Sequence, residues 1–346
     1  MKKYITFFSI ISLLAILVII PVKFSGKKNF EVSCQPNDAE CLSEVFLDYS
    51  KKNGFKPTLL QLEGYVKLNP SATTSCHSVA HKLGANAWRK YSDISEVYNN
   101  GNGVCSFGFL HGAISQAFEE LSNESILQNA NSFCKSLKND NFAASDECDH
   151  GLGHASILKF KNFKDGIYFC TLLVPERSAH SCIQGSIMEY SSNFPIDQLT
   201  ASRLASELYR DCIALEDVSF IKACIFSSGT TSIRSDGQNG DGSKAWGRCL
   251  EIANLYLDDC SDGIGVGAPA ITNWSFDKTK SICSALPLQY QIRCLQSAVK
   301  IFGTVFLDFQ KSESFCSILS KETIEFCRAE LPKLKITIED YRKARA

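Results

Sequence analysis

The chain consists of segments in which apolar residues recur every three or four positions. Residues 201–226 (ASRLASELYRDCIALEDVSFIKACIF) and 290–309 (YQIRCLQSAVKIFGTVFLDF) show this spacing, without the strict alternation that is typical of β-strands. Asn-Gly and Asp-Gly pairs interrupt the pattern at residues 99–103 and 235–243, where we expect loops. The pattern therefore predicts an all-α fold of helices joined by loops.

The helical pattern is punctuated by cysteines that follow one another in pairs. The chain has 16 cysteines, and from position 134 onward the two members of a pair are 11 to 14 residues apart. We expect each pair to form a disulfide between the end of one helix and the first turns of the next, which stabilises the fold by about 3 kcal/mol in the chain-entropy model. The predicted pairs are Cys34/Cys41, Cys76/Cys105, Cys134/Cys148, Cys170/Cys182, Cys212/Cys224, Cys249/Cys260, Cys283/Cys294 and Cys316/Cys327.

The cysteines also bear on the compartment in which the protein works. Buried reduced cysteines in the cytosol are the alternative interpretation, but they do not explain the even spacing. No two cysteines form a CxxC motif, which argues against thioredoxin-type redox chemistry and zinc-ribbon ligation. Structural disulfides persist in oxidising compartments. We therefore expect the cysteine-bearing part of the chain to lie outside the cytoplasm.

A repeat becomes visible when the second cysteine of each pair is used as a marker. From Cys105 to Cys327 these cysteines follow one another at intervals of 33 to 43 residues, a period typical of helical-hairpin solenoids. A small residue at the third position after the marker would let neighbouring helices approach closely. These small residues are Gly108, Gly151, Gly185, Ser227, Gly263 and Ser297. The sequence thus predicts a solenoid-like array of hairpins stapled by disulfides.

The N-terminus differs from the rest of the chain. An uncharged, mostly apolar run over residues 4–22 follows two lysines and is about long enough to cross a bilayer as a helix. No small-x-small cleavage pattern follows it, so residues 1–23 are predicted to be an uncleaved signal anchor. The flanking lysines leave the orientation open, and the cysteines favour a single-pass protein whose bulk is periplasmic or extracellular.

Composition and length set the remaining limits. The 346 residues are 45% hydrophobic and 21% charged, as in ordinary globular proteins. A formal net charge of −1 gives no electrostatic reason to expect a nucleic-acid partner. After a linker over residues 24–33, we expect N-terminal repeats over residues 34–180 and C-terminal repeats over residues 181–346.

All six histidines lie in one third of the chain, between positions 77 and 180. His77/His81 and His150/His154 are HxxxH pairs, whose side chains share one face of a helix. His111 and His154 each stand six residues after their marker cysteine, so stacked units would place them on the same side of neighbouring helices. The matching positions of later units hold residues that cannot replace imidazole, namely Met188, Thr230, Val266 and Lys300.

Histidines in this pattern favour a transition-metal site for zinc, iron or copper. An HxxxH pair and a third histidine from the next hairpin make a three-ligand set that leaves one position open. Two such sets are available, as two mononuclear sites or one dinuclear centre, and His154 is expected to share its metal with His150 and with His180 or His111. The candidate ligands are His77, His81, His111, His150, His154 and His180. Three nearby carboxylates are candidates for further ligands, orienting groups or a general base, namely Asp149, Glu119 and Glu189.

The stretch CDHGLGHA at residues 148–155 raises a specific question. Glycine costs roughly 1 kcal/mol relative to alanine inside a helix, so the two glycines between His150 and His154 need a reason. Close approach of a neighbouring helix explains Gly151, and that approach would also shorten the distance between imidazoles on adjacent hairpins.

Two functions are consistent with these patterns. The first is a membrane-anchored, extracytoplasmic repeat protein that binds a metal, with metal-assisted hydrolysis or redox chemistry as its reaction if it is an enzyme. The second is a non-catalytic scaffold whose repeats bind a protein, peptide or polysaccharide partner, with histidines that fill polar gaps or line a groove. The chain has no HExxH, CxxCH or GxSxG motif, and no residue is assigned a catalytic role.

Overall fold

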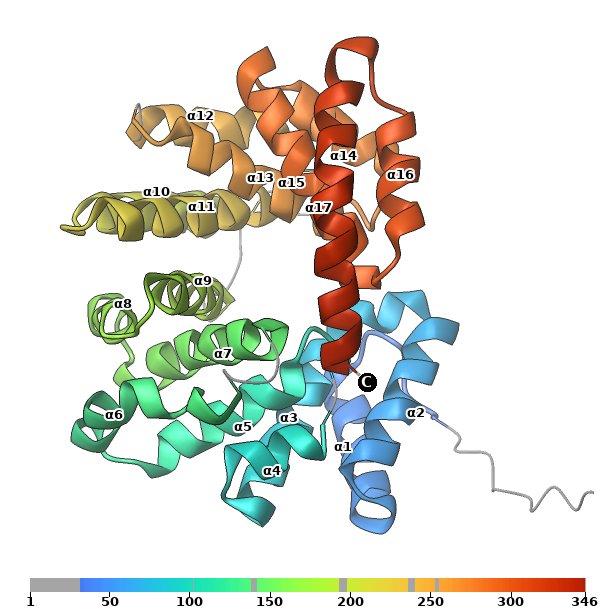
Figure 1. The fold of residues 1–346 in the computed structure, drawn as a ribbon, viewed down its shortest axis with the longest axis vertical. Coiled ribbons are helices and arrows are strands. Elements are labelled where there is room, and N and C mark those ends of the chain that lie inside the picture. The colour runs from blue at the N-terminus through green and yellow to red at the C-terminus, as the bar shows by residue number, and fades with distance from the viewer. Residues whose placement is uncertain are drawn as a thin grey trace, which may run out of the picture. The chain divides into compact units, whose positions relative to one another are not determined.

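The computed structural model describes residues 32–101, 103–137, 142–192, 198–235, 240–252 and 255–345. Within these ranges the chain forms α-helices and three short 3₁₀ helices, and no strand. The prediction of an all-α fold is therefore confirmed. In Figure 1 the helices are α1 (Ala39–Asn53), α2 (Phe55–Leu68), α3 (Thr73–Tyr91), α4 (Ile94–Asn99), α5 (Gly108–Glu120), α6 (Asn123–Asn129), α7 (Phe142–Phe160), α8 (Phe163–Thr171), α9 (Glu176–Ser192), α10 (Gln198–Ile213), α11 (Val218–Ser235), α12 (Gly242–Ile252), α13 (Leu257–Ile271), α14 (Phe276–Ser284), α15 (Leu288–Phe306), α16 (Phe309–Ser317) and α17 (Lys321–Arg345).

The helices from α3 onward form successive hairpins. The odd-numbered helices, which are mostly long, pack one against the next from α3 through α17, and a shorter even-numbered helix connects most neighbours. Residues from Gln35 onward belong to one compact unit. One core cluster of buried side chains extends from Leu110 to Cys327, so successive hairpins share a continuous apolar interior. The predicted helical repeat is confirmed.

Five of the shorter connecting helices, α4, α6, α8, α14 and α16, begin in the same way. The residue before each helix has an oxygen-bearing side chain that accepts a hydrogen bond from a backbone N–H of the first turn, as a helix N-cap does. Since the first N–H groups of a helix lack partners inside the helix, this cap fixes where each hairpin restarts. The capping residues are Asp93, Ser122, Asn162, Ser275 and Asp308.

The disulfides follow the predicted pairing. Cys170 at the end of α8 is bonded to Cys182 in the second turn of α9, and the later hairpins repeat this connection. Cys34 and Cys41 are both disulfide-bonded as well, and the described residues include no free cysteine. The other bonds are Cys76–Cys105, Cys134–Cys148, Cys212–Cys224, Cys249–Cys260, Cys283–Cys294 and Cys316–Cys327.

Glycines bring neighbouring long helices into backbone contact. A Cβ atom on Gly185 of α9 would lie 2.0 Å from the carbonyl oxygen of His150 in α7, and one on Gly153 would lie 1.9 Å from that of Cys182. A Cβ atom on Gly151 would lie 2.9 Å from the ring of His111 in α5. The two glycines of the HGLGH stretch therefore serve opposite sides of α7, because Gly151 faces α5 and Gly153 faces α9.

The last helix returns to the histidine-bearing part of the chain. Helix α17 contacts α7 (Figure 1). Near its end, Tyr341 donates a hydrogen bond to Oε1 of Glu147 in α7 at 3.3 Å, and its ring packs edge-on against Phe107. Next to it, Nη2 of Arg342 donates to the carbonyl oxygen of Leu307 at 2.6 Å. The contacts of Tyr341 hold the end of α17 beside the starts of α5 and α7, and that of Arg342 connects it to the residue that follows α15.

The predicted membrane helix at residues 1–23 lies outside the described residues, and so does most of the predicted linker. Among the helices that the structure describes, none is long and apolar enough to cross a membrane.

Candidate metal centre

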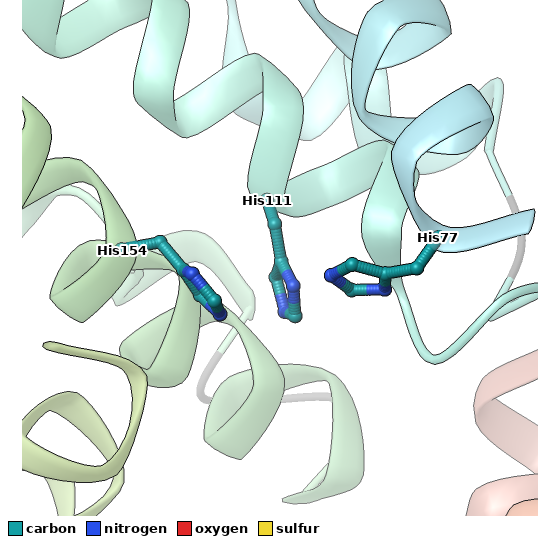
Figure 2. Close-up of side chains that lie close together, drawn as sticks. All are labelled: His77, His111 and His154. Atoms are coloured by element: carbon teal, nitrogen blue, oxygen red, sulfur yellow. The ribbon is translucent and has the colours of Figure 1, made fainter. Parts of the chain in front are cut away.

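Three histidines from three successive long helices converge at one point. His77 comes from α3, His111 from the first turn of α5 and His154 from α7, and Figure 2 shows their rings pointing toward one another. One ring nitrogen of each lies within 4.8 Å of one ring nitrogen of both others. Nitrogen atoms bound to one zinc ion at about 2.1 Å would be roughly 3.4 Å apart, so the three rings would have to move closer together to bind it.

Backbone carbonyls fix which nitrogen of two of these rings carries the proton. Nδ1 of His77 lies 2.8 Å from the carbonyl oxygen of Cys105, and Nε2 of His111 lies 3.0 Å from that of Glu147. A carbonyl oxygen only accepts hydrogen bonds, so each of these nitrogens must be the N–H donor. In the neutral rings, Nε2 of His77 and Nδ1 of His111 are then left with a free lone pair.

A carboxylate fixes which nitrogen of the third ring, that of His154, carries the proton. Nδ1 of His154 donates to Oε2 of Glu189 in α9 at 2.7 Å. This leaves Nε2 as the nitrogen with the lone pair. A histidine whose second nitrogen donates to a carboxylate is the arrangement that commonly orients zinc ligands and makes them more basic.

The three lone-pair nitrogens are buried and find no hydrogen-bond partner among the described residues. Leaving a buried polar atom unsatisfied costs about 1–3 kcal/mol, so three in one place need an explanation. A metal ion bound between them would satisfy all three. The donor set therefore fits a metal that prefers neutral nitrogen ligands.

Burial keeps His77, His81, His111 and His150 in the neutral form that binds metal. The pKa of His77 is lowered from 6.5 to about 4, mainly by burial and also by His154, against the opposing effects of the Cys105 carbonyl and Glu189. Burial is also the main reason why the pKa values of His81, His111 and His150 lie well below 6.5. These rings are unprotonated at neutral pH and offer lone pairs without prior loss of a proton.

Two further histidines border the three. The ring of His81 lies 4.6 Å from that of His77, one turn earlier on α3, and the ring of His150 lies 4.9 Å from that of His154 on α7. His81 also forms part of the wall of a surface cleft of about 710 Å³, together with Glu119 and Lys159. Five of the six histidines thus form one group, which we call the histidine cluster (His77, His81, His111, His150 and His154).

His180 lies apart from the histidine cluster. Its Nε2 is 2.5 Å from Oγ of Ser219 and 3.4 Å from Glu176, and its ring packs against Phe220. None of the ring pairs that connect the other five histidines includes it in the described part of the chain. The structure therefore groups His154 with histidines of the preceding hairpins, and not with His180 of the next.

The three carboxylates that the sequence predicted as further ligands, orienting groups or a general base lie in different places relative to the histidine cluster. Glu189 orients His154, Asp149 is buried in α7, and Glu119 is exposed at the cleft. Sequence reasoning missed Glu147, whose Oε2 is 3.5 Å from Nε2 of His111 and whose Oε1 accepts from Tyr341. Only its place in the turn before His150 could have indicated it.

Comparison with known proteins gives no relative from which a function could be carried over. No family model, no curated protein and no solved structure matches this chain.

Proposed function

We propose that this protein binds a transition metal ion through His77, His111 and His154, and that the metal is zinc. One observation carries the proposal. Each of the three rings has one nitrogen that donates to a carbonyl or carboxylate oxygen, and its other nitrogen is buried and without a hydrogen-bond partner, while the three rings have nitrogens within 4.8 Å of one another. A packing role for these histidines does not explain three buried, unpartnered nitrogens in one place.

The ligand chemistry favours zinc over copper and iron. Imidazole nitrogen suits all three metals. However, every cysteine with a described environment is in a disulfide, and Met188 is the only methionine after Met1, so soft sulfur ligands for Cu(I) are lacking there. Glu147 and Glu189, which lie beside two of the rings, already neighbour ring nitrogens of His111 and His154. Zinc tolerates an all-nitrogen set and has no electronic preference that this cluster would have to meet.

We further propose that the protein is a membrane-anchored, extracytoplasmic metal-binding repeat protein. The uncharged run over residues 4–22 supports the anchor. The disulfides support an oxidising compartment. Protease added to intact cells should digest the chain beyond residue 30, and full protection of that part would contradict this orientation.

Elemental mass spectrometry of the full-length protein in detergent tests the metal proposal. We expect about one zinc per chain, lost in His154→Ala and kept in His180→Ala, which is the matched control because His180 lies outside the histidine cluster. A wild-type protein that takes up no metal from a zinc-containing buffer would contradict the proposal. Equal metal loss in the two variants would contradict it as well.

A further inference from the structure

We infer that His81 is a fourth ligand of the same metal, so that four imidazoles enclose the ion and leave no position open for a substrate. This inference rests on the proposed function and makes it more specific. It distinguishes a metal that holds the fold together from a metal that performs catalysis.

The first support is the arrangement of four rings. His77, His81, His111 and His154 are all mutual neighbours, and the six distances between their ring centroids fall between 4.6 and 6.2 Å. The four ring centroids therefore lie roughly at the corners of a tetrahedron, although the group whose ring nitrogens lie within 4.8 Å of one another contains His77, His111 and His154, so the His81 ring would have to move inward to bind the ion. A tetrahedron is the geometry that zinc adopts in closed structural sites.

The second support is the state of the ring nitrogens. Nε2 of His81 is buried and has no hydrogen-bond partner among the described residues, like Nε2 of His77, Nδ1 of His111 and Nε2 of His154. In the part of the chain that the structure describes, these four histidines have a buried unpaired nitrogen. His81 therefore adds a fourth buried nitrogen, which carries a lone pair in the neutral tautomer that is protonated at Nδ1.

The same criteria separate His81 from His150. The ring of His150 neighbours those of His111 and His154, but it is not paired with the rings of His77 or His81. It also has a hydrogen bond with the backbone of Ser181, and its ring nitrogens are not among the buried unpaired atoms. His150 thus borders the site without facing its centre.

Glycines of α5 explain why His81 is held in place. A Cβ atom on Gly112 would lie 2.0 Å from the carbonyl oxygen of His81, and one on Gly108 would lie 2.8 Å from that of His77. Helix α5 therefore packs directly against the turn of α3 that carries both histidines, on either side of His111. A metal bound there connects α3, α5 and α7, which are otherwise joined by packing and by the Cys76–Cys105 bond.

Cobalt(II) substitution and azide test whether a coordination position is open. Full-length protein loaded with cobalt should give the intense visible bands of a tetrahedral site, and azide should leave them unchanged. In His81→Ala, the vacated position should let azide shift the spectrum. Loss of a direct ligand should weaken zinc binding by more than about 100-fold, since even loss of an orienting group costs 10–100-fold. His150→Ala is the matched control and should remain insensitive to azide.

The outcomes separate this inference from the proposed function. If azide shifts the spectrum of wild-type cobalt protein, or if His150→Ala and not His81→Ala creates azide sensitivity, His81 is not the fourth ligand and a three-histidine site remains. If wild-type protein binds neither cobalt nor zinc, the proposed function itself fails. The wild-type azide titration needs no variant, so the inference can be refuted even if His81→Ala does not fold by circular dichroism.

Discussion

The hydroxyl group of Tyr341 donates a hydrogen bond to Glu147, although the two residues are 194 positions apart in the sequence. Glu147 in turn borders His111, with its backbone oxygen 3.0 Å and its carboxylate oxygen Oε2 3.5 Å from Nε2 of that ring. Burial and the negative charge of Glu147 raise the pKa of Tyr341 well above 10, so the hydroxyl remains a donor. The last helix thereby helps to position His111, a histidine of the proposed metal site.

Tyr341→Phe tests this connection. The variant keeps the ring contact with Phe107 and removes the hydrogen bond to a carboxylate, which should lower the free energy of unfolding by about 2 kcal/mol. Because Glu147 then loses an orienting partner, zinc affinity should fall roughly 10-fold. Tyr168→Phe, at an exposed tyrosine of α8, is the control and should change neither value. Unchanged zinc affinity in Tyr341→Phe, measured by competition with a chelator, would mean that α17 does not act on the site.

Gly153→Ala tests the close contact of α7 with α9. The new methyl group would lie 1.9 Å from the carbonyl oxygen of Cys182, so the helices must separate, and overpacking of this kind costs about 1–3 kcal/mol. Gly247→Ala in α12 is the matched control, because no atom lies within 4 Å of its added Cβ and alanine is the better helix former. Urea denaturation should shift the midpoint down for Gly153→Ala and leave it unchanged or raised for Gly247→Ala. A neutral Gly153→Ala would contradict the close packing.

Each hairpin disulfide should contribute independently to stability. Replacing both Cys212 and Cys224 by serine opens a loop of 12 residues and should lower the free energy of unfolding by about 3 kcal/mol. Peptide mapping of the non-reduced variant should still find the remaining bonds between sequence neighbours. Widespread exchange to long-range pairs would show that the hairpins do not determine the pairing.

The metal-free protein should lose stability as the solution becomes acidic. The pKa of His77 is about 4 in the folded chain and about 6.5 when unfolded, so only the unfolded chain takes up this proton between these values. Between the unfolded pKa of about 6.5 and its folded pKa, each such histidine lowers the free energy of unfolding by up to about 1.4 kcal/mol for every pH unit of acidification. Well above pH 6.5 it has no effect on the pH dependence. His77→Gln should reduce the slope. Equal slopes in wild type and His77→Gln would contradict neutral burial of His77.

Local spacing in the sequence was sufficient to predict the helices, the repeat and the disulfides. Partners such as Cys170 and Cys182 are close in sequence, and their spacing restricts them to one hairpin. The shared register of His111 and His154 likewise indicated neighbouring positions on α5 and α7.

The grouping around His154 could not be predicted from the HxxxH pairs alone. His180 stands two residues before its cysteine and His154 six residues after its own, a difference of two helical turns or about 12 Å along the axis. His180 therefore lies at another level of the repeat, where it meets Ser219. The contact between Tyr341 and Glu147 depends on how the hairpins stack over the whole chain, and no local pattern encodes it.

Zinc-edge X-ray absorption of the full-length protein tests the central claim most directly, because it reports the atoms bound to the metal. We expect three or four nitrogen neighbours at about 2.0–2.1 Å, with the outer-shell scattering of imidazole rings and no sulfur at about 2.3 Å. His111→Ala, which removes one converging nitrogen, should lower this imidazole contribution or abolish zinc binding. Zinc bound through sulfur or carboxylate oxygen, or an unchanged spectrum in His111→Ala, would show that the histidine cluster is not the metal site.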